Sequence, residues 1–238
     1  MNPLKVEILT LFPGMFGPVI NESILKRAQE KKLVEVKLHD IREYTKDKHR
    51  KVDARPYGGG PGMVLTPEPI FLAVEKLKKP RSRVVLLAPQ GERLSHAVAK
   101  RLSGYKHLIL ICGHYEGIDE RVKEGLVTDE VSIGDYVLTC GELPAMVLLD
   151  SIVRLIPGVL GDDESKEFDS FAQGLLEYPQ YTRPREFRSM AVPEILFSGD
   201  HSKIQIWRRE MALAATKARR PDLLNKVKVK GLKIDEGG

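Results

Sequence analysis

The sequence predicts an α/β fold in which helices cover both faces of a parallel sheet. Two apolar runs, RVVLLA at 83–88 and HLILIC at 107–112, are typical of strands buried on both faces. Helical stretches separate such runs, as parallel strands require. Glycine-bearing loops follow the runs at 86–92 and 111–117, and a third loop of this design lies at 132–145. Ligands collect at the carboxyl ends of parallel strands, so the loops favour one shared pocket.

The amino-terminal elements can be assigned in order. LKVEILTLF at 4–12 predicts a first strand, and 21–32 a helix with Ile24, Leu25 and Ala28 on one side. VEVKLHDI, which follows at 34–41, alternates like a strand with one solvated face. The prolines and four glycines of RPYGGGPGMVLTPEP at 55–69 argue against a regular element, and TPEP begins the next helix. This stretch lacks the GKS or GKT ending of a P-loop, so we interpret it as a structured loop at an interface or over a ligand.

The carboxyl-terminal part changes character twice. GELPAMVLLDSIVRLIPG at 141–158 is so densely apolar that we expect a helix buried on most sides, ending at Pro157 and Gly158. An acidic, irregular connector follows at 161–174 and is typical of a segment that becomes ordered when substrate binds. Beyond it we expect a long helix capped by Asp200 and stopped by Pro221.

Charge and cysteine usage limit the class of protein. The chain has 238 residues, a net charge of +5 and a pI of about 9.1. Residues 160–178 contain six acidic residues and one basic residue, whereas 179–233 contain thirteen basic and five acidic residues. Two cysteines without a CxxC pair argue against a disulfide scaffold or a zinc motif. With no signal-peptide pattern and no membrane-length apolar run, we expect a cytoplasmic protein without membrane contact.

Four motifs together identify a family. LAPQG, CGHYEGIDER, SIGDYVLTCGELPA and DSFAQGLLEYPQYTRP resemble, in this order, the bacterial tRNA (guanine-N1)-methyltransferase family of the SPOUT superfamily. The resemblance implies a parallel sheet with a deep trefoil knot, a small helical carboxyl-terminal domain and a homodimer. It divides the chain into a donor-binding domain at 1–160, a flexible acidic linker at 161–174 and a basic tRNA-binding domain at 175–238.

The resemblance also implies a methyl donor and its pocket. S-adenosylmethionine would lie against the three glycine loops, with Glu116 near its positively charged sulfur. From the residues alone, Glu116 is equally an acid that favours the start of the IDERVKEG helix. The family usually has two glycines where this chain has Cys140 and Gly141, and the Cβ atom of Cys140 would narrow the pocket. The implied donor-binding residues are Leu87, Pro89, Gly113, Tyr115, Glu116, Ser132, Ile133, Gly134, Asp135, Tyr136, Val137, Leu138, Gly141 and Pro144.

Methylation of guanine at N1 needs a base for the departing proton and a cation beside O6. By resemblance, Asp169 is the base and Arg154 stabilises the negative charge on O6. From the residues alone, Asp169 is one acid of a solvated linker, and Arg154 is a cation that favours a helix carboxyl terminus. The histidines have no paired ligand spacing, so no residue is assigned to a metal, although the resemblance suggests that Mg²⁺ takes part.

The substrate implied by the resemblance is the tRNA anticodon stem-loop, methylated at the guanine 3′ of the anticodon. Tyr178, Tyr181 and Phe187 alternate with the basic residues and suit base stacking or core packing. Two alternatives stay open: a SPOUT ribose 2′-O-methyltransferase, which needs no base at Asp169, and a non-catalytic RNA-binding protein. The candidates for phosphate contacts, which would otherwise form a solvated charged face, are Arg183, Arg185, Arg188, Arg208, Arg209, Lys217, Arg219 and Arg220.

Overall fold

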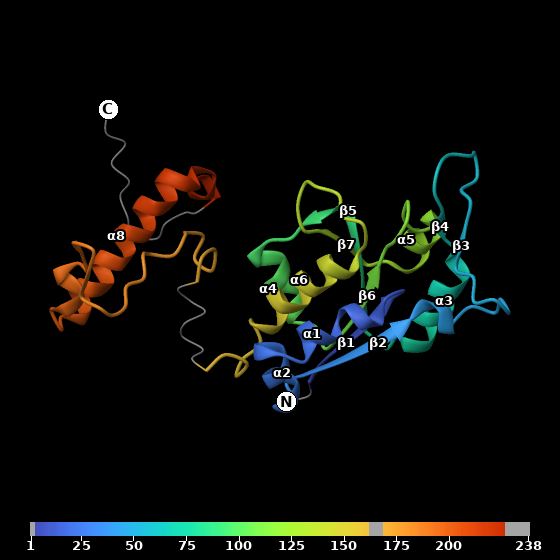
Figure 1. Cartoon of the computed structure of the whole chain (residues 1–238), viewed down its shortest axis with the longest axis horizontal. Coiled ribbons are helices and arrows are strands. Elements are labelled where there is room, and N and C mark those ends of the chain that lie inside the picture. The colour runs from blue at the N-terminus through green and yellow to red at the C-terminus, as the bar shows by residue number, and fades with distance from the viewer. Residues whose placement is uncertain (1–2, 162–168, 227–238) are drawn as a thin grey trace. The chain divides into compact units, whose positions relative to one another are not determined.

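A computed structural model describes residues 3–161 and 169–226 and divides the chain into two compact units (Figure 1). The first unit comprises Met1–Gly161 and the second Asp162–Gly238. The stretch 162–168, which includes most of the acidic part of the expected linker, lies outside the described residues. Each unit is described by itself.

The first unit is built on a parallel sheet of five strands. The strands are β1 (Leu4–Thr10), β2 (Val34–Asp40), β5 (Arg83–Arg93), β6 (His107–Cys112) and β7 (Asp129–Ser132). They lie in the order β2-β1-β6-β5-β7, and all neighbours pair in parallel. Every residue of β6 is buried, because this strand lies at the centre of the sheet. The predicted α/β fold with a central parallel sheet is confirmed.

Helices cover both faces of this sheet, which gives three layers (Figure 1). Strand side chains alternate between the faces, so Ile8 and Leu110 join one core cluster while Leu9 and Ile111 join the other. The first cluster packs against α1 (Gly17–Ile20), α2 (Ser23–Glu30), α4 (His96–Ser103) and α6 (Glu142–Val153). The second packs against α3 (Pro67–Leu77) and α5 (Glu120–Leu126).

Two local expectations were wrong. The glycine-rich stretch at 55–69 contains strand β4 (Val64–Leu65), which pairs antiparallel with β3 (Asp53–Ala54). Helix α6 ends at Val153 and not at Pro157. Beyond Arg154, backbone amides bond three residues back instead of four. The Leu155 amide donates to Ile152 O and the Ile156 amide to Val153 O, both at 3.1 Å. Pro157 has no N–H to donate to Val153 O, and the Ile156 amide bonds there instead. As expected, α3 begins directly after Thr66.

The second unit is organised around one long helix, α8 (His201–Arg219). Asp200 caps it by accepting a hydrogen bond from the Lys203 amide at 3.1 Å, and Pro221 follows its end, as predicted. Shorter elements surround it, namely β8 (Glu186–Phe187), β9 (Met190–Ala191), η3 (Glu194–Phe197) and η4 (Pro221–Lys226). Among the described residues, no helix combines the length and the apolar character that crossing a bilayer requires.

Residues 169–174, which we expected to belong to the linker, form turns that are bonded to the second unit. The Phe171 amide donates to Leu175 O at 2.7 Å. Ser170 Oγ accepts from the Glu177 amide at 3.0 Å, and Thr216 of α8 accepts from the Leu176 amide at 2.9 Å. These bonds attach the described end of the linker to α8.

Candidate active site

A cavity of about 490 Å³ lies at the carboxyl ends of β5, β6 and β7. We call it the glycine-loop cavity, because the stretch 86–92 of β5 and the loops at 111–117 and 132–145 provide most of its wall. Parallel neighbours end at the same edge of the sheet, so loops far apart in sequence meet there. The predicted convergence on one pocket is therefore present, but the expectation of a loop at 86–92 was wrong. That stretch belongs to β5, whose pairing with β7 shifts register between Leu87 and Glu92.

Backbone contacts hold two of these loops together. The Gly141 amide donates to Gly113 O at 2.8 Å, and His114 and Cys140 form an antiparallel bridge beside it. A Cβ atom on Gly141 would lie 2.6 Å from Gly113 N and 2.8 Å from Cys112 Cα. Such approaches to backbone atoms cannot be relieved by a side-chain rotation. Position 141 therefore requires glycine, whereas the neighbouring position accommodates Cys140.

The loop after β7 is fixed by its own polar groups. Ser132 Oγ donates to Gly134 O at 3.0 Å and accepts from the Gly134 amide at 3.3 Å. Gly134 has a φ of 156°, and a Cβ atom there would lie 2.5 Å from the Tyr136 ring. Asp135 is exposed and lies 3.9 Å from an Arg93 nitrogen. The loop thus has a buried turn and an exposed tip.

Most of the predicted donor-binding residues meet in this cavity. Gly134, Asp135 and Tyr136 belong to the same loop but do not line the cavity. Sequence reasoning missed several lining residues, including Gln90, Ile118, Lys123 and Thr139. Their only signal was a position inside or beside the glycine loops. The predicted residues that line the cavity are Leu87, Pro89, Gly113, Tyr115, Glu116, Ser132, Ile133, Val137, Leu138, Gly141 and Pro144.

Glu116 lies in a loop and not at a helix terminus. Helix α5 begins at Glu120, and Asp119 caps it by accepting from the Arg121 amide at 3.0 Å. The Glu116 amide donates to Met63 O at 3.0 Å, so the glycine-rich stretch at 55–69 packs against this edge of the cavity. Glu116 thus lines the cavity without the helix-terminus role that its sequence position suggested, and its carboxylate packs against Gly62 of the glycine-rich stretch.

The two cysteines differ in environment. Burial raises the pKa of the Cys112 thiol well above its ordinary value, and the neighbouring Glu142 and Cys140 raise it further. Cys112 belongs to the core of β6, whereas Cys140 is half-buried and lines the cavity. Only Cys140 is therefore placed to contact a ligand.

The two predicted catalytic residues belong to different units. Arg154 is the exposed C-cap residue of α6 in the first unit. Asp169 belongs to the second unit, where it lines a cavity of about 390 Å³ together with Tyr178, Arg208 and Arg209. We call this the Asp169 cavity. The structure thus describes the surroundings of Arg154 in the first unit and those of Asp169 in the second. Neither residue lines the glycine-loop cavity.

Arginines and aromatic rings alternate on the second unit. The Arg208 guanidinium lies 5.0 Å from the centre of the Tyr178 ring, and its buried Nε atom has no hydrogen-bond partner among the described residues. Arg185 lies 4.1 Å from the Phe197 ring centre and pairs with Glu194 at 3.0 Å. Arg183 and Arg188 are exposed. The unit therefore presents cations and stacking surfaces side by side.

Comparison with known proteins decides the family. A profile of the family described as tRNA (Guanine-1)-methyltransferase TrmD matches residues 4–226. The chain belongs to the tRNA (guanine-1)-methyltransferase family. Proteins named tRNA (guanine-N(1)-)-methyltransferase are similar to it along nearly their whole length. That of Staphylococcus carnosus is 57% identical over 224 residues, which cover 94% of this chain and 91% of the relative.

Relatives from other bacteria agree. The protein of Geobacillus kaustophilus is 58% identical over 224 residues, covering 93% of this chain and 92% of the relative. That of Moorella thermoacetica is 58% identical over 228 residues, covering 94% and 91%. Both carry the same name as the Staphylococcus protein. Because the tRNA (guanine-1)-methyltransferase family matches residues in both units, the resemblance first drawn from four motifs is confirmed across the chain.

Proposed function

We propose that the chain transfers a methyl group from S-adenosylmethionine to N1 of the guanine 3′ of the tRNA anticodon. The observation that carries this proposal is the glycine-loop cavity, at the edge of the sheet where the family binds its donor. The names of the relatives identify the base and the atom that those proteins methylate. For this reason we favour neither ribose 2′-O-methylation nor a non-catalytic RNA-binding role.

The residues of the cavity fit S-adenosylmethionine. A volume of about 490 Å³ lies within the range of small-molecule sites. Leu87, Pro89 and Ile133 offer apolar and backbone surface for a flat base, and Gly113 allows close approach. Glu116 offers a carboxylate to a positive sulfur. Bound there, the donor supplies an electrophilic methyl group on a sulfonium.

The chain's own residues manage the proton and charge of guanine. We assign Asp169 as the base that accepts the N1 proton, and Arg154 as the cation that stabilises negative charge on O6. The surroundings of Asp169 support this assignment, because Arg208 and Arg209 line the same cavity and offer cations to a nucleotide beside the carboxylate. Tyr178, under the Arg208 guanidinium, adds a ring on which a base can stack.

The second unit is the proposed contact for the tRNA anticodon stem-loop. Exposed cations at Arg183, Arg188 and Arg209 suit phosphate groups. Arg185 and Arg220 already have carboxylate partners, at Glu194 and Asp222, so we expect them to contribute less. Phe187 and Tyr181 are about half-exposed beside these residues and suit unstacked bases.

Four finer features also belong to this proposal. We infer a trefoil knot from the family. The loops after β6 and β7 are in contact through the bond from the Gly141 amide to Gly113 O and the bridge between His114 and Cys140, and these contacts are compatible with a knot. A homodimer is supported by exposed apolar side chains on α6 and before α1. A requirement for Mg²⁺ rests on the family resemblance alone, whereas a cytoplasmic location rests on the sequence pattern and on the family. Chelation followed by addition of Mg²⁺ would test the former.

The direct test is nucleoside mass spectrometry. Unmodified tRNA is incubated with the protein and methyl-labelled S-adenosylmethionine, digested and analysed. We expect label in N1-methylguanosine at the position 3′ of the anticodon. Label in a 2′-O-methylated nucleoside would support the ribose alternative, and tRNA binding without transfer would support the non-catalytic one.

The role of Asp169 is tested by Asp169→Asn. We expect kcat to fall at least tenfold while donor affinity changes by only a few-fold, because the carboxylate acts on guanine and not on the sulfonium. Single-turnover kinetics and calorimetry measure the two quantities. A variant that keeps more than about a tenth of the wild-type kcat would assign the base to another group.

A further inference from the structure

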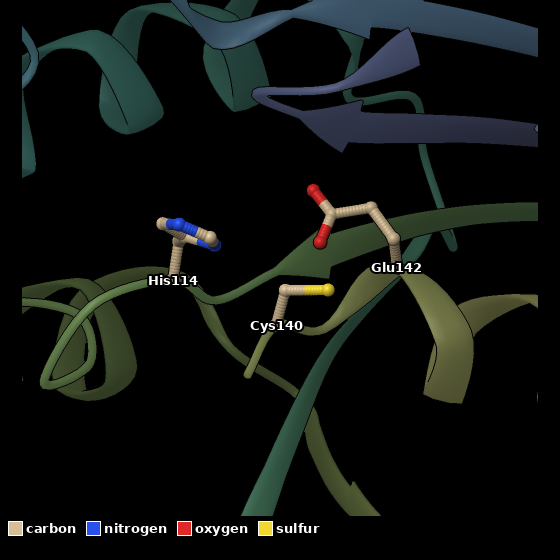
Figure 2. Close-up of side chains that lie close together, drawn as sticks. All are labelled: His114, Cys140 and Glu142. Carbon is tan, nitrogen blue, oxygen red and sulfur yellow. The ribbon is translucent and has the colours of Figure 1, made fainter. Parts of the chain in front are cut away.

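A histidine, a cysteine and a glutamate meet at the wall of the glycine-loop cavity. His114 lies in the loop after β6, Cys140 in the loop before α6, and Glu142 in the first turn of α6 (Figure 2). One ligand atom of each side chain lies within 4.8 Å of the others. We call this group the His-Cys-Glu cluster. The cluster matches none of the residue spacings by which metal sites are recognised in sequences, because its three residues come from two loops and a helix.

Two polar atoms of the cluster are buried without a partner. Glu142 is fully buried, and its Oε1 atom accepts a hydrogen bond from Thr10 Oγ1 at 2.6 Å. Its Oε2 atom has no hydrogen-bond partner among the described residues, and neither has Nδ1 of His114. A buried carboxylate with a free oxygen is costly unless a cation or a donor satisfies it. The chain therefore presents unused acceptors where the three side chains converge.

Neighbouring groups fix the cluster. The bond from Thr10 orients the Glu142 carboxylate. The His114 ring lies between two aromatic rings, 5.1 Å from the centre of Phe12 and 4.5 Å from that of Tyr115. The antiparallel bridge between His114 and Cys140 fixes the backbone of these two residues relative to each other. A hydrogen bond such as that from Thr10 to Glu142 is typical of carboxylates that bind a metal.

We propose that the His-Cys-Glu cluster binds a Zn²⁺-class divalent cation. An imidazole nitrogen, a thiolate and a carboxylate oxygen form a ligand set typical of Zn²⁺, whereas Mg²⁺ selects oxygen ligands. Ligand atoms around a tetrahedral zinc are roughly 3.3–3.8 Å apart, so side-chain adjustments of about 1 Å suffice. The cation would connect the loops after β6 and β7 to α6.

The site would be reached from the glycine-loop cavity. His114 and Cys140 line that cavity, whereas Glu142 is fully buried and does not line it. Three protein ligands leave the fourth position of a tetrahedral ion open to water or another small ligand. This inference does not depend on the proposed methyl transfer, because it concerns the binding of a cation by the chain itself.

The test uses the untagged full-length protein, reduced and freed of metal with a chelator. Titration with Co²⁺ reports thiolate coordination through a charge-transfer band and tetrahedral geometry through visible bands. We expect one equivalent to bind, Zn²⁺ to displace it, and Zn²⁺ to raise the Tm. Circular dichroism establishes that each variant is folded before titration.

Matched variants assign the ligands. Cys140→Ser and Glu142→Gln should each lower Zn²⁺ affinity at least tenfold, and Cys140→Ser should abolish the charge-transfer band. Cys112→Ala is the control, because it removes the only other thiol of the chain and should keep the band. The proposal is overturned if the wild type shows no such band, if Cys112→Ala alone abolishes it, or if all variants bind Zn²⁺ equally.

Discussion

At the scale of single residues, two adjacent positions of one loop have opposite requirements. Gly141 faces the backbone of Gly113 and Cys112 so closely that no side chain fits. Cys140, one residue earlier, turns its sulfur toward the Glu142 carboxylate (Figure 2), and a His114 ring nitrogen lies within 4.8 Å of that sulfur. The departure from the pair of glycines that the resemblance implies thus falls on the position that can accept a side chain.

Gly141→Ala tests the close approach. The added methyl group has to displace backbone, so we expect a loss of about 1–3 kcal/mol in unfolding free energy. Separation of the two loops should also weaken S-adenosylmethionine binding at least tenfold. Denaturant unfolding and calorimetry measure these effects. Gly14→Ala is the control, because nothing lies within 4 Å of a Cβ atom there. Wild-type behaviour of Gly141→Ala would show that the loops separate freely.

Residue-level prediction succeeded where backbone freedom was the signal and failed where side chains meet across loops. The glycines near 91, 113, 134 and 141 predicted the position of the cavity, although the first of them lies in β5 and not in a loop. The meeting of His114 with Cys140 and Glu142 was not predictable, because it depends on a bridge between loops 26 residues apart in sequence. Local periodicity predicts helices and strands but not which side chains of two separate loops come close together.

At the scale of elements, Asp129 joins three segments of the first unit. It begins β7 and accepts hydrogen bonds from Arg83 of β5 at 2.8 Å and from Arg101 of α4 at 2.6 Å. Thr128 Oγ1 adds a third bond at 2.9 Å. Burial alone would raise the pKa of Asp129, but the bonds from Thr128, Arg101 and Arg83 outweigh burial and lower the pKa.

Asp129→Asn should therefore destabilise the protein in a pH-dependent way. The carboxylate has a lower pKa in the folded chain than in the unfolded chain, where it is about 3.9. Its contribution is then complete above that value and is lost as the pH falls through the folded pKa. We expect a loss of about 1.5–3 kcal/mol at pH 7 that shrinks in acid. Denaturant unfolding across this pH range measures it.

Glu92→Gln is the matched control, because Glu92 pairs with the same Arg101 on an exposed surface. We expect a loss below about 1 kcal/mol there. An equal loss in the two variants would contradict a special role for the buried carboxylate.

Elements were predictable to different degrees for physical reasons. The buried runs of β5 and β6 and the capped α8 had strong local signals, and they lie where expected. The pairing of β3 with β4 joins residues on either side of a glycine-rich stretch. Such a stretch has low strand propensity, so no local pattern indicated the two short strands. The end of α6 depended on Pro157, which has no N–H to continue the helix and therefore acts several residues before its own position.

At the scale of the whole molecule, apolar side chains lie exposed on the first unit. Leu143 and Val147 of α6 are 46% and 45% exposed, and they are four residues apart on one side of the helix. Phe12, Met15 and Val19 are also exposed, on the segment whose buried side joins the same core cluster as α6. Such surfaces favour association. The homodimer is therefore a prediction with a defined candidate interface.

A subunit-mixing experiment tests whether one active site needs two chains. Asp169→Ala removes the proposed base, and Gly141→Ala damages the cavity. If base and cavity come from opposite subunits, each mixed dimer contains one intact site and one inactive site. Half of the dimers in an equal mixture are mixed. The mixture should therefore recover about a quarter of wild-type activity. Activity assays after subunit exchange, verified by mass spectrometry, measure it. A mixture that stays inactive, or a fully active monomer in sedimentation, would refute the shared site.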